Sequence, residues 1–546
     1  MVNKASLLVE NARLWSEGAP IASADALAIA DGRIAAVGRA ADLASWVGPG
    51  TRRIDARGST ATPGLVDAHI HLIAWARAAA ELPLEGARSA GAVAAAVGDF
   101  VRRHPGADAV VGRGWAADGW AEPPERSRLD AVSGTRPVLL HSRDFHSLWV
   151  NSEALRRAGV GRSTPDPPGG RLERDAAGEP TGVVREHATR LFSSLLPRHQ
   201  VERDLALARD AMRRLNAYGV TGIHDFEGAA EQRTLRALAR GPGPRLRILS
   251  FLARPGFEPA RELGLESGWG DDCFRLGGLK LFADGTLGSR TAALLAPYDG
   301  TTERGLDLIP PEELRALVAE AVEAGLTPAI HAIGDRAVRS ALDAFAAAGR
   351  ALRSLALPPR IEHAQLVDPR DLGRFARLGV AASMQPTHCI SDMDLARAHW
   401  GTRLSGAYPW NSLVRGGALL AFGSDAPVED PSVADGLHAA VTRQRRDLDP
   451  SQAFVPAERL TLDEALRSYT ETPARLSGTW PRLGRLAASS RADLVVWNED
   501  LHRLSIAELH RVTPAYTVID GEVVHESPEL LEPAARGDRR ARAESR

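Results

Sequence analysis

The stretch 63–71 constrains the fold of this chain more than any other. Pro63-Gly64 ends the preceding segment, and an apolar run then leads to two histidines, His69 and His71. Side chains alternate along a strand, so both imidazoles point to one side. If that side is the interior of a barrel, near the strand's C-terminal end, the two rings converge on one metal ion. The alternative is an ordinary strand with two hydrogen-bonded histidines.

A regular alternation of strands and helices begins near residue 205. Amphipathic helices, such as those predicted at 311–324 and 337–348, separate several apolar segments. Together with the strand that starts at Leu65, eight strands are predicted, the others at 219–225, 246–252, 278–282, 327–331, 360–363, 380–384 and 418–422. Eight strands in this alternation predict an α/β fold, a (β/α)8 TIM-like barrel.

Polar residues stand at or near the C-terminal ends of these predicted strands. His331 and His363 close two strands, Lys280 lies within another, and Asp425 follows the last. In such a barrel the active site lies at the face where all strands have their C-terminal ends. Each residue alone could be an ordinary packed or exposed side chain, but coincidence explains their matching positions poorly. We therefore predict a metal site at this face.

Both ends of the chain are predicted to pair into one small β-sandwich domain. Asp31-Gly32 and Asp520-Gly521 are hairpin signals flanked by apolar strands, and 492–497 adds another strand. Neither end alone is long enough for a sandwich. The predicted domains are 1–62 with 480–546 for the composite β-domain and 63–479 for the barrel, with a tail that frays from about 528.

An α+β insertion is predicted at 83–205, after the first barrel strand, where it would cover the barrel's mouth. It begins with a predicted amphipathic helix at 90–104 and contains a Pro/Gly-rich loop at 165–170. Five of its side chains could line a pocket or equally pack the insertion's own core: Trp115, Trp120, His141, His146 and Trp149. We predict a moderately apolar pocket roofed by this insertion.

Composition argues against several classes of function. The 546 residues are 44% hydrophobic and 25% charged, as in ordinary globular enzymes, and the net charge of −2 predicts neither a nucleic acid nor a membrane partner. Two distant cysteines predict no disulfide framework. No apolar run suits a bilayer span or a secretion signal, so a cytoplasmic protein is expected. If the chain forms an oligomer, a homodimer is expected, because dimers are the commonest oligomers.

Several motifs together resemble the amidohydrolase superfamily, and within it the amidohydrolase-3 branch of YtcJ-like and N-substituted formamide deformylase-like proteins. The segments that carry the resemblance are 63–71, 280–285, 331–335, 362–365 and 423–427. Weaker matches are Gly114-Trp115, 383–386, 484–486 and 492–495. The resemblance extends from about residue 5 to 525 and so covers nearly the whole chain.

The resemblance implies a metal-dependent hydrolase that cleaves the C–N bond of an amide or N-substituted formamide by attack of metal-bound hydroxide. His69, His71 and Asp425 would hold one divalent ion, and His331 and His363 a second. Lys280 matches a lysine that such enzymes carry as a carbamate, whose oxygens bridge both ions. Zinc suits these ligands. Asp425 would act as the catalytic proton carrier.

Substrate contacts are expected from five residues, Trp115, His146, His224, Arg290 and His388. His224 and His388 could instead support the metal ligands. The expected partner is a small amide-type molecule. Two further functions are considered: hydrolysis of a cyclic amide, carbamate or ester at the same metal centre, and a non-catalytic regulatory role. The regulatory role is disfavoured because no ligand position is lost.

Overall fold

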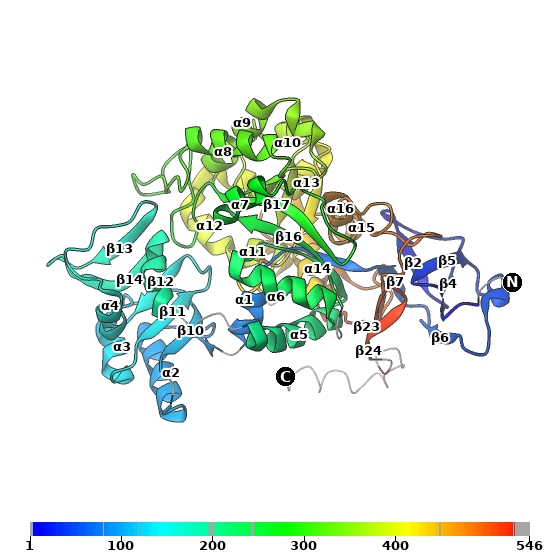
Figure 1. The fold of residues 1–546 in the computed structure, drawn as a ribbon, viewed down its shortest axis with the longest axis horizontal. Coiled ribbons are helices and arrows are strands. Elements are labelled where there is room, and N and C mark those ends of the chain that lie inside the picture. The colour runs from blue at the N-terminus through cyan, green and yellow to red at the C-terminus, as the bar shows by residue number, and fades with distance from the viewer. Residues whose placement is uncertain are drawn as a thin grey trace.

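The computed structural model describes residues 4–79, 81–106, 108–117, 119–195, 201–241, 245–446, 449–527 and 529. A central barrel is flanked on one side by a β-domain and on the other by a lobe formed by residues 82–195, called the insertion below (Figure 1). Apart from residue 529, the tail predicted to fray from 528 lies outside the described residues. None of the described helices has the length and apolar character that a membrane span needs.

Eight parallel strands form the barrel sheet, which confirms the predicted (β/α)8 fold. In chain order they are β8 (Leu65–Ile70), β15 (Val220–Asp225), β16 (Arg247–Ala253), β17 (Phe274–Phe282), β18 (Pro328–Ala332), β19 (Arg360–His363), β20 (Ala381–Met384) and β21 (Leu420–Phe422). Most residues of these strands are buried, as expected when a parallel sheet is covered on both faces. All strands therefore end at one common mouth.

One strand begins earlier than its sequence pattern suggests. β17 starts at Phe274, whereas the apolar pattern predicts a start at Gly278. Gly278 has a φ of +149°, and a Cβ atom there would collide with the backbone of Thr327. The glycine is thus required by the close approach of the neighbouring chain, and it interrupts the pattern without ending the strand.

The barrel closes between its first and last strands through a buried carboxylate. Asp67 Oδ1 accepts hydrogen bonds from the backbone N–H groups of His69 and Ser424, at 3.1 and 2.9 Å. Its Oδ2 accepts from the Ser424 hydroxyl at 2.5 Å. In addition, the backbone N–H of Asp425 donates to the His69 carbonyl at 2.6 Å. Closure therefore fixes Asp425 next to the two histidines of β8.

Helices surround the barrel and connect its strands (Figure 1). Those that follow the strands are α1 (Leu72–Ala78), α5 (Val201–Ala217), α6 (Ala229–Arg240), α7 (Phe257–Glu262), α8 (Pro311–Glu323), α9 (Asp335–Ala348), α10 (Leu372–Leu378), α11 (Pro386–Ser391), α12 (Met393–Trp400), α13 (Trp410–Arg415), α14 (Val433–Thr442), α15 (Leu462–Tyr469) and α16 (Glu471–Leu476). Their apolar faces and the outer faces of the strands share one hydrophobic core.

The β-domain contains strands from both ends of the chain, which confirms the predicted composite sandwich. One sheet has the order β5-β4-β1-β6, from β1 (Leu7–Glu10), β4 (Ala26–Ala30), β5 (Arg33–Gly38) and β6 (Arg52–Asp55). The other has the order β24-β23-β22-β7-β2-β3, from β2 (Arg13–Ser16), β3 (Ala19–Pro20), β7 (Thr60–Pro63), β22 (Leu494–Trp497), β23 (Pro514–Ile519) and β24 (Glu522–Glu526). The core between them includes Leu27, Ile29, Leu494 and Val518.

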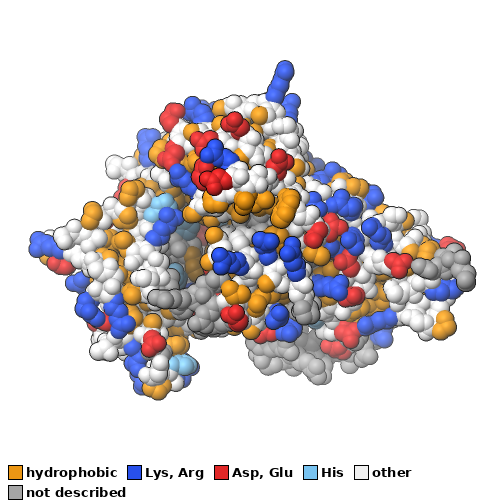
Figure 2. All heavy atoms as spheres, viewed as in Figure 1, with side chains coloured by type: hydrophobic (Ala, Val, Ile, Leu, Met, Phe, Trp, Pro, Cys, Tyr) orange, Lys and Arg blue, Asp and Glu red, His pale blue; other side chains and the backbone are white. Residues whose placement is uncertain are grey.

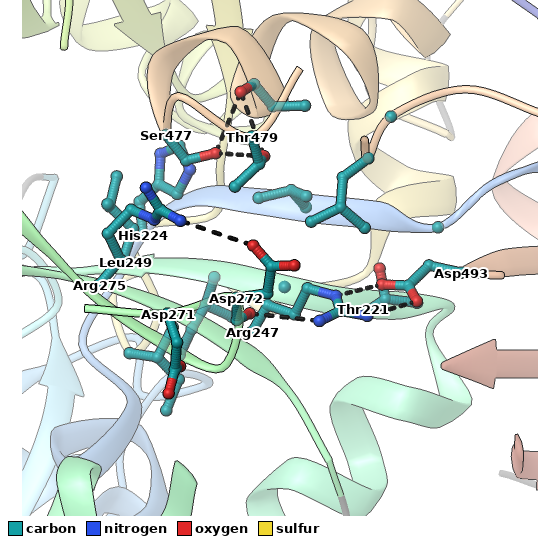
Figure 3. A pocket seen from close by; sticks show the side chains of 18 residues that line it. Thr221, His224, Arg247, Leu249, Asp271, Asp272, Arg275, Ser477, Thr479 and Asp493 are labelled. Atoms are coloured by element: carbon teal, nitrogen blue, oxygen red, sulfur yellow. Dashed lines mark hydrogen bonds and ion pairs between the residues drawn. The ribbon is translucent and has the colours of Figure 1, made fainter. Parts of the chain in front are cut away.

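The floor of the barrel is joined to the β-domain by an ion-pair cluster, called the floor clamp below. Figure 3 shows its Arg247–Asp493 pair. Arg247, on β16, donates to both carboxylate oxygens of Asp493 at 2.5 and 2.8 Å and to Asp520 at 2.7 Å. The small cavity beside it, of about 50 Å³, has mostly apolar walls. Because this face lies opposite the mouth, the clamp is a structural feature of the fold.

The insertion has its own sheet, of order β13-β14-β12-β11-β10-β9. Its strands are β9 (Leu82–Pro83), β10 (Val110–Trp115), β11 (Val138–Ser142), β12 (Ser147–Val150), β13 (Gly170–Arg174) and β14 (Pro180–Glu186), and its helices are α2 (Ala90–Arg103), α3 (Arg126–Ser133) and α4 (Ser152–Ala158). Hydrophobic clusters pack on the sheet, one of them around Trp115 and Trp149. The insertion is therefore a folded lobe with cores of its own.

Candidate metal centre

Asp425 and the two histidines of β8 form a compact set of donor atoms. Asp425 Oδ1 lies 3.5 Å from Nε2 of His69 and 3.5 Å from Nε2 of His71. Two ligands about 2.0–2.2 Å from a tetrahedral ion lie roughly 3.3–3.6 Å apart, so these separations suit one shared ion. These three residues form a group whose donor atoms could hold a metal.

A buried network orients the His69 ring. Nδ1 of His69 lies 2.6 Å from Glu362 Oε2, so the ring donates there and leaves Nε2 for a metal. Glu362 in turn accepts from Arg360 at 2.5 Å. Burial opposes ionisation of Glu362, but Arg360 and His69 hold its pKa well below the usual value. The carboxylate stays charged and fixes the ring.

His224 belongs to this supporting network. Its Nδ1 lies 2.8 Å from an Arg360 nitrogen, and its ring is buried below the ligands, beside the small cavity of the floor. It is absent from the walls of the large cavity at the mouth. Of the two roles considered for His224, its position agrees with support of the ligands and not with contact to substrate.

His331 and His363 lie beside the first set, each with one ring nitrogen already engaged. Their ring centroids are 4.5 Å apart, and that of His363 is 4.9 Å from that of His69. Nε2 of His331 lies 3.1 Å from the Gly285 carbonyl, and Nδ1 of His363 lies 2.8 Å from Gln385 Oε1. Nδ1 of His331 and Nε2 of His363 are thus the ring atoms left for a ligand role.

Lys280 is buried among these residues without a hydrogen-bond acceptor. Its Nζ has no partner within the described part of the chain and lies 4.5 Å from the ring centroid of Phe226 and 5.0 Å from that of Phe282. An ammonium has three donors to satisfy. Burial lowers the pKa of Lys280 to about 8. The orphaned nitrogen fits a lysine that is modified or joined to an added group, and the surrounding imidazoles and carboxylate suit a metal.

Composition carries a signal for Lys280 that motif reasoning overlooked. Lys280 is one of only two lysines among the 67 lysine and arginine residues, the other being Lys4. The chain otherwise uses arginine for its cations. Arginine cannot replace lysine as a nucleophilic amine, because the guanidinium keeps its proton. The retained lysine is therefore informative about chemistry at this position.

His388 comes closer to the centre than the sequence suggests. Its Nε2 lies 3.9 Å from Asp425 Oδ2, is buried, and has no hydrogen-bond partner among the described residues. With His363 and Asp425 it forms a second group whose donor atoms could hold a metal. The two groups share Asp425, so this carboxylate is the common point of the centre. Its position after β20 was the available signal.

Two of these residues have unusual backbone conformations. The φ angles of His363 and Asp425 are +73° and +59°, a region that side chains other than glycine rarely adopt. Such strain is found mostly where function requires a fixed side-chain direction. Burial would raise the pKa of Asp425, but His69, His71, His363 and His388 lower it well below its usual value.

A cavity of about 1220 Å³ opens between the mouth and the insertion. Histidine side chains are visible in the recess there (Figure 2). All six predicted metal-site residues line the cavity, as do four of the five predicted substrate contacts: Trp115, His146, Arg290 and His388. Trp120 lines it too, whereas His141 and Trp149 do not. Trp115 also belongs to the insertion's core and donates to the Leu140 carbonyl at 2.7 Å.

Sequence reasoning missed the partners that hold these side chains. Glu362 and Gln385 lay within recognised motifs, but nothing showed that they bind His69 and His363. Glu186 and Asp144 of the insertion also line the cavity, and Glu186 accepts from Nδ1 of His146 at 2.7 Å. No local pattern marks Glu186. The Asp-x-His spacing of Asp144 and His146 was the only hint.

Comparison with known proteins agrees with this geometry. The amidohydrolase-3 model, described as the Amidohydrolase family, matches residues 52–525. The chain is 32% identical over 523 residues to a putative amidohydrolase, YtcJ, of Bacillus subtilis, covering 92% of this chain and 96% of that protein. It is 29% identical over 545 residues to an N-substituted formamide deformylase of Arthrobacter pascens, covering 96% and 99%.

A solved structure extends the likeness. An uncharacterized metal-dependent hydrolase from Pyrococcus horikoshii superposes with a TM-score of 0.72 at 26% identity, over 90% of this chain and 96% of that one. The family match covers most of the chain, and all six ligand positions predicted from the motifs meet at the mouth of the barrel. The chain therefore belongs to the amidohydrolase family, in its amidohydrolase-3 branch, and is a hydrolase.

Proposed function

We propose that this hydrolase cleaves the C–N bond of an amide or N-substituted formamide. The observation that carries the proposal is the position of Asp425, whose Oδ1 lies 3.5 Å from Nε2 of both His69 and His71 at the end of a large cavity. This arrangement combines a metal-ligand set with a carboxylate that can carry a proton. The likeness to an N-substituted formamide deformylase supports the choice of substrate class.

Two zinc ions are proposed as the cofactor. His69, His71 and Asp425 would hold the first ion, and His331 and His363 the second. When bound, such ions polarise the scissile carbonyl and lower the pKa of a water molecule. Lys280 would join the two sites as a carbamate: its ammonium first loses one proton, the neutral Nζ bonds to the carbon of CO2, and a second proton leaves the nitrogen. A cation without acceptors would thereby become an anion. The orphaned Nζ of Lys280 supports this assignment.

Asp425 is the proposed proton carrier. Its carboxylate lies at the mouth beside the proposed ligands His69 and His71, where it could accept the proton that the attacking water releases. Its other oxygen, Oδ2, lies towards His388 at 3.9 Å. The proton would then pass to the nitrogen of the leaving amine, which must be protonated before it departs.

The N-substituent is proposed to be apolar. Trp115 and Trp120 line the cavity from the insertion side, and Phe282, which is 38% exposed, lines it from the barrel side. Replacing Trp115 with alanine should raise KM for amides with large apolar substituents more than for small amides. Equal kinetics on both groups would contradict this assignment.

Metal and carbamate content provide the first test. Wild type should hold about two zinc ions per chain by elemental analysis, and growth with ¹³C-bicarbonate should give one carbamate signal by NMR. Lys280→Ala should lose the signal, part of the metal and the activity. Lys4→Ala is a matched control, because Lys4 is exposed and its Nζ donates a hydrogen bond to the Ser45 carbonyl. One ion, with no carbamate, would instead indicate a mononuclear site.

A substrate panel separates the remaining alternatives. N-alkyl and N-aryl formamides and acetamides should be hydrolysed faster than matched esters, cyclic amides and carbamates. Preference for esters or cyclic compounds would replace the proposed substrate class while keeping the same metal centre. Zinc-loaded protein that hydrolyses none of these compounds would contradict the proposal.

A further inference from the structure

The insertion places one imidazole against the metal centre. His146 follows β11 and lines the large cavity, and its ring centroid lies 5.7 Å from that of His331. The four histidines proposed as metal ligands all come from the barrel: His69, His71, His331 and His363. His146 is therefore the point at which the lobe reaches the reacting groups.

Glu186 fixes the direction of this ring. Its Oε2 accepts from Nδ1 of His146 at 2.7 Å, so only Nε2 remains for a molecule in the cavity. Glu186 and Phe145, the residue before His146, both have positive φ angles, +53° and +59°. Backbone strain of this kind costs stability, and it is retained mostly where function requires a fixed side-chain position. The strain favours a functional position for His146.

The barrel loop after β17 locks Glu186 in place from the other side. Oε1 of Glu186 accepts from the Thr291 hydroxyl at 2.5 Å. A Cβ atom on Gly285 would collide with both Glu186 and Thr291, so the glycine makes room for the carboxylate. The carbonyl of this same Gly285 engages Nε2 of His331 at 3.1 Å. Glu186 of the insertion and His331 of the metal centre thus both hydrogen-bond to this one loop.

A second carboxylate of the insertion strengthens this connection. Asp144 Oδ1 accepts from the backbone N–H of His146 at 3.1 Å, and Oδ2 accepts from the hydroxyls of Thr286 and Ser289 at 2.8 and 3.2 Å. Burial disfavours a charged His146, but Glu186 and Asp144 outweigh it and raise the pKa of His146 to about 9. His146 is thus held through its ring by Glu186 and through its backbone by Asp144.

We propose that the insertion completes the active site: Nε2 of His146 hydrogen-bonds the amide group that is cleaved, and Glu186 is the positioning residue for that ring. This inference rests on the proposed amide hydrolysis and adds a catalytic residue from outside the barrel. It also gives the insertion a chemical role beyond roofing the cavity.

The test uses zinc-loaded full-length protein and two readouts. The first is kcat/KM on the best amide of the panel, which should fall roughly 100-fold in His146→Gln. The second is the Kd of acetohydroxamate, which carries C=O and N–H groups and should bind about tenfold more weakly to this variant. Zinc content and melting temperature should stay at wild-type values.

Glu186 is tested by graded substitution. Glu186→Gln keeps an acceptor for Nδ1 and should lower kcat about tenfold with little change in KM, whereas Glu186→Ala should lose as much as His146→Gln. A purely structural role would instead lower both variants' melting temperature without this ranking. If His146→Gln does not fold, Glu186→Gln carries the test, because it leaves the imidazole in place.

His141→Gln is the matched control. His141 lies on β11 in the same lobe, its ring is stacked on Phe145 at 5.3 Å, and it does not line the cavity. This variant should keep wild-type hydrolysis and acetohydroxamate binding. Wild-type values of both readouts in His146→Gln would overturn the inference. If wild type hydrolyses no amide, the proposed function fails, and the acetohydroxamate titration alone decides the role of His146.

Discussion

The floor and the mouth of the barrel accommodate a buried basic side chain in different ways. At the floor, the guanidinium of Arg247 meets both Asp493 and Asp520 at 2.5–2.8 Å. At the mouth, Nζ of Lys280 and Nε2 of His388 are buried without a partner among the described residues. Unpaired buried polar atoms cost stability. The charged groups of the floor pair with one another and so join two domains. At the mouth, the two nitrogen atoms remain available to a metal or a substrate.

The largest effect that would sharpen this comparison is at Asp425. Asp425→Asn removes the carboxylate that both histidines of β8 approach to 3.5 Å and that carries the proton in the proposed reaction. We expect kcat to fall roughly 10⁴-fold, together with loss of zinc from the first site. Steady-state kinetics and elemental analysis measure both. Turnover close to wild type would show that Asp425 is not the shared ligand.

At the floor, the expected loss is in stability instead. Arg247→Met leaves two carboxylates without their cation, and we expect the free energy of unfolding to fall by about 2–4 kcal/mol. The value of kcat/KM should stay within about twofold of wild type. Urea unfolding and kinetics on the same preparations test this. Arg53→Met is the control, because the Arg53 side chain that pairs with Glu10 is 57% exposed and screened by water, so its loss should change stability far less. Lost activity at unchanged stability would break the distinction between the two ends.

Many residues of the mouth could be predicted, because each lies at the end of a strand that its own local sequence reveals. A strand's own apolar pattern locates its C-terminal end, and barrel topology then brings His69, His331, His363 and Asp425 together. The two glycines before Lys280 hid the true start of β17, since close packing against Thr327 is a tertiary constraint.

The supporting contacts could not be predicted in the same way. Glu362 lies 293 residues from His69, and Glu186 is 40 residues from His146 and 105 from Thr291. No spacing rule connects positions so far apart in the sequence. The floor clamp is equally remote, because Arg247 is 246 residues from Asp493. Ligand positions follow from fold class, whereas their orientation depends on pairings that only the folded chain reveals.

One such pairing gives an intermediate effect. Glu362→Gln can still accept from Nδ1 of His69, but it loses the negative charge that Arg360 and His69 share. We expect zinc affinity to fall about 10- to 100-fold, measured by competition with a chromophoric chelator. Glu10→Gln, which alters a glutamate–arginine pair of the β-domain, should leave affinity unchanged. Equal zinc affinities for Glu362→Gln and wild type would show that the charge of Glu362 does not contribute to metal binding.

The smallest effect concerns His224, which links the mouth's network to the floor cavity. Burial and the neighbouring Arg360 hold the pKa of His224 well below 6.5. The folded ring stays neutral on mild acidification while the unfolded ring takes up a proton, so stability is lost as pH falls below about 6.5. Between pH 7.5 and 5.5 this amounts to about 1.4 kcal/mol for one histidine. In zinc-free protein, His224→Gln should flatten the stability–pH curve from urea unfolding by that amount. Parallel curves for variant and wild type would mean that acid sensitivity arises at the ligands themselves.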